Sequence, residues 1–119
     1  MRIGSTADFL LRLGVAFAFL FPPVNAFLDP YAWVGYFPSF VGDMFPEMVV
    51  LHVFGLVEVI IGLWILSGRR IFIPSVVGAV LLLLIVAFNL GDFQVLFRDV
   101  SIAFMALALA VVHRPRQAA

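Results

Sequence analysis

Apolar residues fill four long stretches of the chain, at about residues 7–28, 48–66, 71–90 and 95–112. Each stretch is close to the roughly 20 residues that a helix needs to cross the hydrocarbon core of a bilayer. Short polar segments separate the last three, Ser-Gly-Arg-Arg at 67–70 and Gly-Asp-Phe-Gln at 91–94. The pattern predicts an all-α protein, an integral membrane four-helix bundle that forms a single transmembrane domain over residues 1–119.

The first stretch is interrupted in two ways. Pro22 and Pro23 remove two backbone donors, so we expect the helix to kink or end there. Arg2 followed by an apolar run is also typical of a secretory signal peptide. Arg12 lies within that run and no small-residue cleavage site follows it, which favours a first spanning helix.

Residues 29–47 differ in kind from the four stretches. Proline recurs at 30, 38 and 46, among several aromatic residues that include Tyr31 and Trp33. Prolines at this spacing prevent a spanning helix, and tryptophan and tyrosine favour the headgroup region of a bilayer. We therefore expect an interfacial aromatic loop between the first and second spans.

The composition agrees with a membrane location and narrows the chemistry. Hydrophobic residues make up 65% of the 119 residues, charged residues 12%, and the mean hydropathy is +1.19, whereas a soluble domain is about a quarter charged. A formal net charge of zero argues against a nucleic acid as partner. The absence of cysteine excludes disulfides, thiolate metal sites and cysteine nucleophiles, and two histidines alone do not make a metal site.

Arginine is distributed unevenly over the expected loops. With four spans, the N-terminus, the 67–70 turn and the C-terminus lie on one side of the membrane, and they hold Arg2, Arg69, Arg70, Arg114 and Arg116. The opposite side holds Asp29, Asp43, Glu47 and Asp92. The positive-inside rule then predicts a multi-pass protein of the cytoplasmic (inner) membrane with both termini in the cytoplasm.

Ionisable residues inside the expected spans form an inner layer. Arg12 on the first span and Glu58 on the second lie at similar expected depths, so we expect a buried ion pair, which Asp8 one turn before Arg12 could share. One interpretation is a structural pair that fixes helix packing. The other is a proton-relay or ligand-binding carboxylate, since polar groups within spans are costly and are functional candidates by default.

Polar residues also gather towards the opposite end of the spans, in an outer layer formed by His52, Asn89, Asp92, Arg98 and Asp99, with Asn25 beyond the proline pair. One interpretation is a set of snorkelling and helix-capping groups. The other is a ligand-binding pocket, formed by His52, Asn89, Arg98 and Asp99 and covered by the aromatic loop. A quinone suits such a pocket, because its carbonyls accept hydrogen bonds from donors such as His52 and Arg98 while its tail lies in lipid.

Small residues share helix faces with several of these groups. At 100° per residue, His52, Gly55, Glu58 and Gly62 fall within about 120° of arc. The corresponding stripes of the third and fourth spans are Ser75-Gly78-Leu82-Ile85-Asn89 and Arg98-Ser101-Met105-Ala108. Because small residues let helices approach closely in membranes, we expect all three stripes to face the bundle interior.

Three short motifs resemble those of the DoxX-like family of small membrane proteins: LLRLG at residues 10–14, GLVEVIIG at 55–62 and FRDV at 97–100. The resemblance covers nearly the whole chain and implies four transmembrane helices. The polar residues that occupy positions of these motifs in this chain are Arg12, Glu58, Arg98 and Asp99. Where the family often has a glycine and a basic residue late in the first span, this chain has Pro22, Pro23 and Asn25.

The resemblance also implies an association with membrane redox systems, because some members are described as subunits of quinone-reducing thiosulfate oxidoreductases and others as membrane partners of oxidative-stress enzymes. The chain has no haem-attachment motif, cysteine or nucleotide fingerprint, so electrons would come from a bound quinone or a partner subunit. We expect no covalently bound cofactor, no catalytic motif in the chain itself, and a second membrane protein or another copy as partner. The alternatives are a structural or assembly subunit without a ligand and a small transporter.

Overall fold

The computed structural model describes residues 4–34, 37 and 39–114. Four long helices occupy the four apolar stretches: α1 (Ser5–Leu28), α4 (Glu47–Ser67), α5 (Phe72–Phe88) and α6 (Phe93–Val112). The short elements are α2 (Tyr31–Val34), α3 (Ser39–Met44) and the 3-10 helix η1 (Leu90–Asp92). The described residues contain no strand, so the all-α expectation is confirmed.

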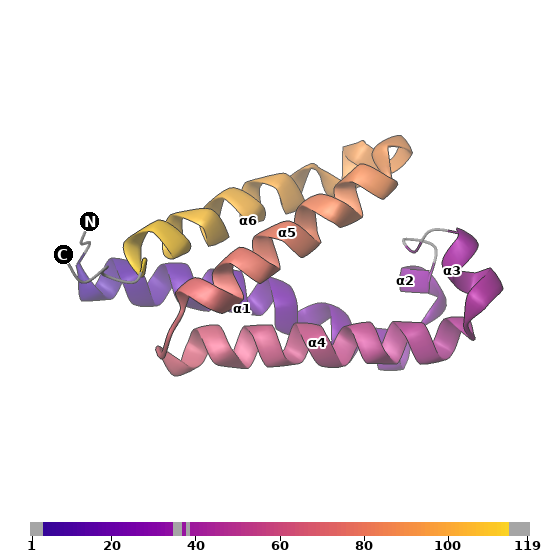
Figure 1. Cartoon of the computed structure of the whole chain (residues 1–119), viewed down its shortest axis with the longest axis horizontal. Coiled ribbons are helices and arrows are strands. Elements are labelled where there is room, and N and C mark those ends of the chain that lie inside the picture. The colour runs from indigo at the N-terminus through magenta and orange to yellow at the C-terminus, as the bar shows by residue number, and fades with distance from the viewer. Residues whose placement is uncertain (1–3, 35–36, 38, 115–119) are drawn as a thin grey trace.

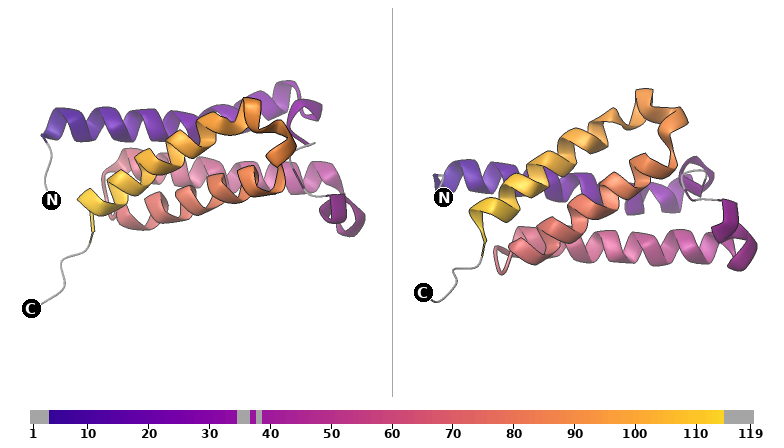
Figure 2. Two further views of the ribbon diagram at one scale, coloured as in Figure 1. Left: turned by 90° about the horizontal axis from the view of Figure 1, so that it is seen from above. Right: turned by 45° about the horizontal axis from the view of Figure 1, so that its top comes forward.

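The four long helices are arranged as two pairs. α1 packs along α4 and α5 packs along α6, and the second pair crosses the first obliquely (Figure 1). The turned views show α2 and α3 at one end of the molecule, and the first turn of α1 and the last turn of α6 at the other (Figure 2). Helices α1 and α4 are long and apolar enough to cross a membrane, and α5 is an apolar helix of 17 residues.

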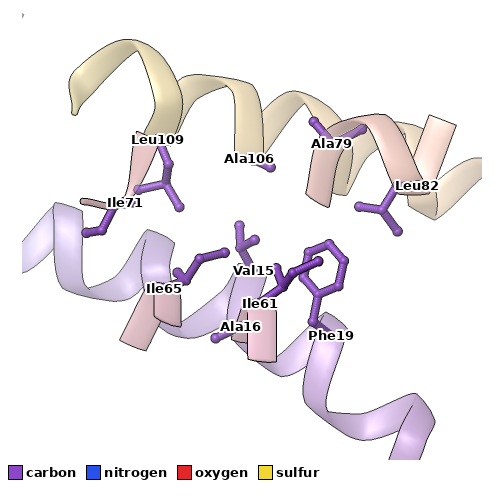
Figure 3. Packing of buried hydrophobic residues seen from close by; sticks show 11 residues of the cluster. Val15, Ala16, Phe19, Ile61, Ile65, Ile71, Ala79, Leu82, Ala106 and Leu109 are labelled. Atoms are coloured by element: carbon purple, nitrogen blue, oxygen red, sulfur yellow. The ribbon is translucent and has the colours of Figure 1, made fainter. Parts of the chain in front are cut away.

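The two prolines of α1 do not end the helix. α1 continues through Pro22 and Pro23 to Leu28, and its ribbon changes direction beyond Phe19 (Figure 3). A Cβ atom on Gly55 of α4 would lie 3.4 Å from Cβ of the buried Pro23. The half of α1 that follows the bend therefore lies directly against α4 at Gly55.

The segment expected to be an interfacial loop contains two short helices. Pro30 directly precedes α2, and Pro46 is the N-cap of α4, positions where the missing backbone donor costs little. Asn25 Oδ1 accepts a hydrogen bond of 2.8 Å from Trp33 Nε1, which ties α2 to the last turns of α1. Pro38 lies outside the described residues.

The hydrophobic core lies where the two helix pairs cross (Figure 3). All four long helices contribute, together with the turn before α5, through Val15, Ala16, Phe19, Ile61, Ile65, Ile71, Ala79, Leu82, Ala103, Ala106 and Leu109. Small side chains at the crossing bring the helices close together. A Cβ on Gly62 would lie 2.7 Å from Leu20 Cγ and 3.2 Å from the Ala16 carbonyl oxygen, and one on Gly78 would lie 2.6 Å from Phe19 Cζ.

The expected interior stripes are confirmed in part. On α4 and α5, Gly55, Gly62, Ser75, Gly78 and Leu82 are buried. His52, at the end of the α4 stripe, is exposed instead.

The expected stripe of α6 is wrong. Ser101, Met105 and Ala108 are exposed, and the buried residues of this helix are Leu96, Ala103, Ala106, Leu109 and Ala110. The expected stripe started from Arg98, and an error of one residue rotates the chosen face by about 100°. The true inner face passes through Asp99.

The outer faces of the four long helices are rich in large exposed apolar side chains. Phe17 and Phe27 of α1, Leu56 of α4, Leu84 of α5 and Phe104 of α6 are all exposed. Exposed apolar surface on this scale marks a face that is covered by lipid or by another protein.

We expect Gly62→Ala to destabilise the protein by about 1–3 kcal/mol, the usual cost of overpacking a close contact. Leu20 has a flexible end that can move, but the Ala16 carbonyl is backbone and cannot. Thermal unfolding in detergent, followed by circular dichroism, measures the change. The matched control is Gly14→Ala on α1, where a new Cβ meets nothing within 4 Å and the gain in helix propensity leaves the melting temperature equal or higher. Equal melting temperatures for Gly62→Ala and the unchanged protein would contradict the close packing of α1 on α4.

Candidate functional site

A cavity of about 630 Å³ lies between the two helix pairs, on the side of the core that faces α2 and α3. Its walls are mainly apolar, and seven aromatic side chains contribute: Phe17, Phe21, Trp33, Phe37, Phe40, Phe54 and Phe88. Trp33 and Phe40 come from α2 and α3, so the expected aromatic cover is part of the cavity wall. The volume is in the range of pockets that hold drug-sized ligands.

Among the residues that the structure describes, three charged ones line this cavity: Glu58, Arg98 and Asp99. Glu58 belongs to the inner stripe of α4, one turn from Gly55, and Asp99 lies on the inner side of α6 between Leu96 and Ala103. Arg98 is the chain neighbour of Asp99 and is exposed at the cavity margin. The structure therefore brings together three residues that the sequence assigned to two different layers.

The Glu58 side chain has no hydrogen bond or ion pair with any described residue. It is only partly buried, and it lines the cavity together with Pro22, Pro23 and Phe54. A carboxylate in an apolar environment is costly without a positive partner or hydrogen-bond donors. This leaves Glu58 available to a ligand that enters the cavity.

The other residues of the expected outer layer lie elsewhere. His52 does not line the cavity; its exposed ring stacks on Phe27 of α1, with 4.9 Å between centroids. Asn89 Nδ2 donates a hydrogen bond of 2.8 Å to the Ile85 carbonyl of its own helix. The side chain of Asp92 lies outside the described part of the structure. The outer layer thus divides into cavity residues, Arg98 and Asp99, and residues at the helix ends.

The structure does not bring Arg12 and Glu58 together as the expected ion pair. Arg12 Nε lies 3.0 Å from Asp8 Oδ2, and Arg12 Nη1 donates to the carbonyl oxygens of Leu66, at 3.2 Å, and Ile65, at 3.5 Å. The expectation compared only the depths of the two residues along their helices. It did not allow for the length of the arginine side chain, which reaches the backbone carbonyls at the end of α4. Glu58 is eight residues before Leu66, about 12 Å away along the helix axis.

The sequence also did not reveal the role of His113. Its Nε2 lies 2.6 Å from Asp8 Oδ1, so one carboxylate joins Arg12 and the end of α6. We call Asp8, Arg12 and His113 the terminal clamp, because they connect the first turns of α1 with the last turns of α4 and α6. His113 stands 105 positions after Asp8. Only the expectation that both chain ends lie on one side of the bundle could have indicated this contact.

The cavity offers apolar surface and charged groups, but no metal-ligating cluster among the described residues. No group of three or more histidine, cysteine, aspartate or glutamate side chains in the described ranges could hold a metal ion. The cavity combines aromatic walls with two carboxylates and one guanidinium. It suits a ligand with a ring system and a polar or charged group.

No family model, curated protein or solved structure matches this chain. The resemblance to the DoxX-like family therefore stays a prediction.

We expect Asp8→Ala to destabilise the protein by about 1–3 kcal/mol, because both Arg12 and His113 lose a charged partner that is itself largely shielded from solvent. The control is Asp43→Ala on α3, an exposed aspartate for which we expect no measurable change. Thermal unfolding of both variants in the same detergent provides the comparison. A melting temperature for Asp8→Ala equal to that of Asp43→Ala would show that the clamp does not contribute to stability.

Proposed function

We propose that this chain is a multi-pass protein of the cytoplasmic membrane whose cavity binds the polar head of a lipid-soluble ligand. A quinone is the candidate ligand, and the protein acts as an accessory, quinone-facing subunit of a membrane redox system. The observation that carries the proposal is the aromatic cavity with Glu58, Arg98 and Asp99 in its wall. The resemblance to the DoxX-like family supports the same function.

The outer surface supports the membrane part of this proposal. Large apolar side chains are exposed on all four long helices, and lipid is the simplest cover for all of them at once. At 1.5 Å per residue, the 17 residues of α5 extend about 26 Å, close to the roughly 30 Å of hydrocarbon in a bilayer. The other three long helices are longer.

The distribution of charge supports an orientation with both termini in the cytoplasm. Arg12, Arg69, Arg70 and Arg114 belong to the end of the molecule that carries the terminal clamp. The α2–α3 end carries acidic residues, among them Asp29, Asp43 and Glu47. An excess of arginine on one side is typical of cytoplasmic loops.

The cavity lining supports a quinone in particular. Aromatic side chains such as Phe54 and Trp33 offer flat apolar surface for a ring, and the Arg98 guanidinium offers donors for a carbonyl oxygen. His52, the other expected donor, lies outside the cavity and takes no part. A ring held between α4 and α6 would leave its tail free to extend into lipid.

Single cysteines test the topology, because the chain contains no cysteine of its own. Ser5→Cys marks the start of α1 and Asp43→Cys marks α3, and both positions are exposed. In intact cells we expect a membrane-impermeant maleimide to label Asp43→Cys and to label Ser5→Cys only after permeabilisation. Labelling of both positions in intact cells would contradict the proposed topology.

Quinone binding tests the site itself. Because Arg98 supplies the donors, we expect Arg98→Ala to weaken binding of a short-chain ubiquinone by about 10-fold or more, as measured by titration of the purified protein. His52→Ala is the matched control, a polar residue of the same region that does not line the cavity, and its affinity should be unchanged. Equal affinities of both variants, or no binding by the unchanged protein, would contradict the quinone site. Such a result, with a stoichiometric membrane partner still bound, would instead favour a structural or assembly subunit.

A further inference from the structure

The unpaired Glu58 carboxylate gives the cavity a second chemical preference. Among the charged residues of the wall, two are acidic, Glu58 and Asp99, and one is basic, Arg98. We propose that this cavity also binds hydrophobic organic cations, with the positive charge held beside Glu58 and the rings against the aromatic walls. This inference rests on the proposed function only in requiring a cavity that is open to lipid-soluble ligands, and it does not require a quinone.

The first argument for a cationic ligand is the charge of Glu58. Arg98 directly follows Phe97 on the exposed side of α6 and is adjacent in the chain to Asp99, whereas Glu58 stands on α4 without a positive partner among the described residues. A positive charge brought next to a partly buried carboxyl group stabilises its ionised form. A cationic ligand supplies that charge.

The second argument for a cationic ligand is the aromatic lining of the cavity. A cation is attracted to the face of an aromatic ring, and aromatic side chains recognise quaternary ammonium groups in this way. Phe17 and Phe21 of α1, Phe54 of α4 and Trp33 of α2 all line the same space as Glu58. Aromatic rings from three helices therefore line the cavity into which the cation would enter.

The size and donor set of the cavity favour an organic cation over a metal ion. A volume of about 630 Å³ is far larger than an ion needs and fits a molecule with several rings. In the described part of the chain, no three metal-ligating side chains stand together. A large, weakly hydrated cation also leaves water more readily than a small one.

The proposal can be measured with tetraphenylphosphonium, a permanently charged cation with four aromatic rings. Trp33 lines the cavity, whereas Trp64 bonds to the Arg69 carbonyl at the other end of α4, so a Trp64→Phe background leaves one reporter in the site. We expect saturable quenching of Trp33 fluorescence by tetraphenylphosphonium in detergent-purified protein. We expect Glu58→Gln to weaken this binding at least tenfold.

Two further variants make the result specific. Glu47→Gln removes an exposed carboxylate from the first turn of the same helix, outside the cavity, and should bind tetraphenylphosphonium unchanged. Arg98→Gln removes the only positive charge of the described cavity wall. It should therefore bind the cation more tightly, by several-fold, although it weakens quinone binding.

The possible outcomes separate the two proposals. Unchanged affinity in Glu58→Gln, or weaker cation binding in Arg98→Gln, would overturn the cation site; the second variant changes an exposed residue, so its fold is not at risk. If a short-chain ubiquinone binds and tetraphenylphosphonium does not, the cation site is refuted and the quinone site stands. If neither ligand binds, both proposals fail.

Discussion

The close approach of α1 to α4 and α5 is the contact on which the rest of the structure depends. Gly62 of α4 has no side chain where Leu20 of α1 packs, and Gly78 of α5 has none where Phe19 of α1 packs, so α1 lies close to both helices at this level. A larger residue would push α1 away from α4 at Gly62 and away from α5 at Gly78. Because the pairs cross obliquely at the core, the space beyond it, towards α2 and α3, is filled only in part, and the cavity lies there.

The ionisable residues serve two different purposes on the two sides of this crossing. On one side, Asp8 pairs with Arg12 and His113, and Arg12 also donates a hydrogen bond to a carbonyl at the end of α4. These contacts account for the polar groups of the three side chains without a ligand. On the other side, Glu58 has no such partner among the residues that the structure describes. This contrast within one small bundle marks the second group, and not the first, as the candidate site.

The sequence predicted the helices well because apolar length and proline position are local properties. The four long helices, and the small buried residues of α4 and α5, follow from them. The rotation of each helix about its own axis is not a local property. Starting the α6 stripe from Arg98 placed Met105 inside and left out Ala106, because a charged residue at a cavity margin was taken as the centre of the inner face.

The candidate site was predicted only in part for a similar reason. Depth along a helix locates a Cα atom, but Arg12 acts through a guanidinium that reaches the end of α4, and His52 stacks on Phe27 although its depth suits the cavity. Asp99 and Glu58 needed the helix rotations before they could be assigned to one space. Contacts such as that of His113 with Asp8 depend on the assembled ends and have no signature in any one segment.

The hydrogen bond between Trp33 and Asn25 couples the cover of the cavity to the half of α1 that follows the prolines. Prolines weaken the helix at Pro22 and Pro23, so this half can pivot with less loss of backbone hydrogen bonding than an unbroken helix would require. Any outward swing of α2 must carry the end of α1 with it or break this 2.8 Å bond. The cover of the cavity and the end of α1 are thus linked through an amide–indole contact.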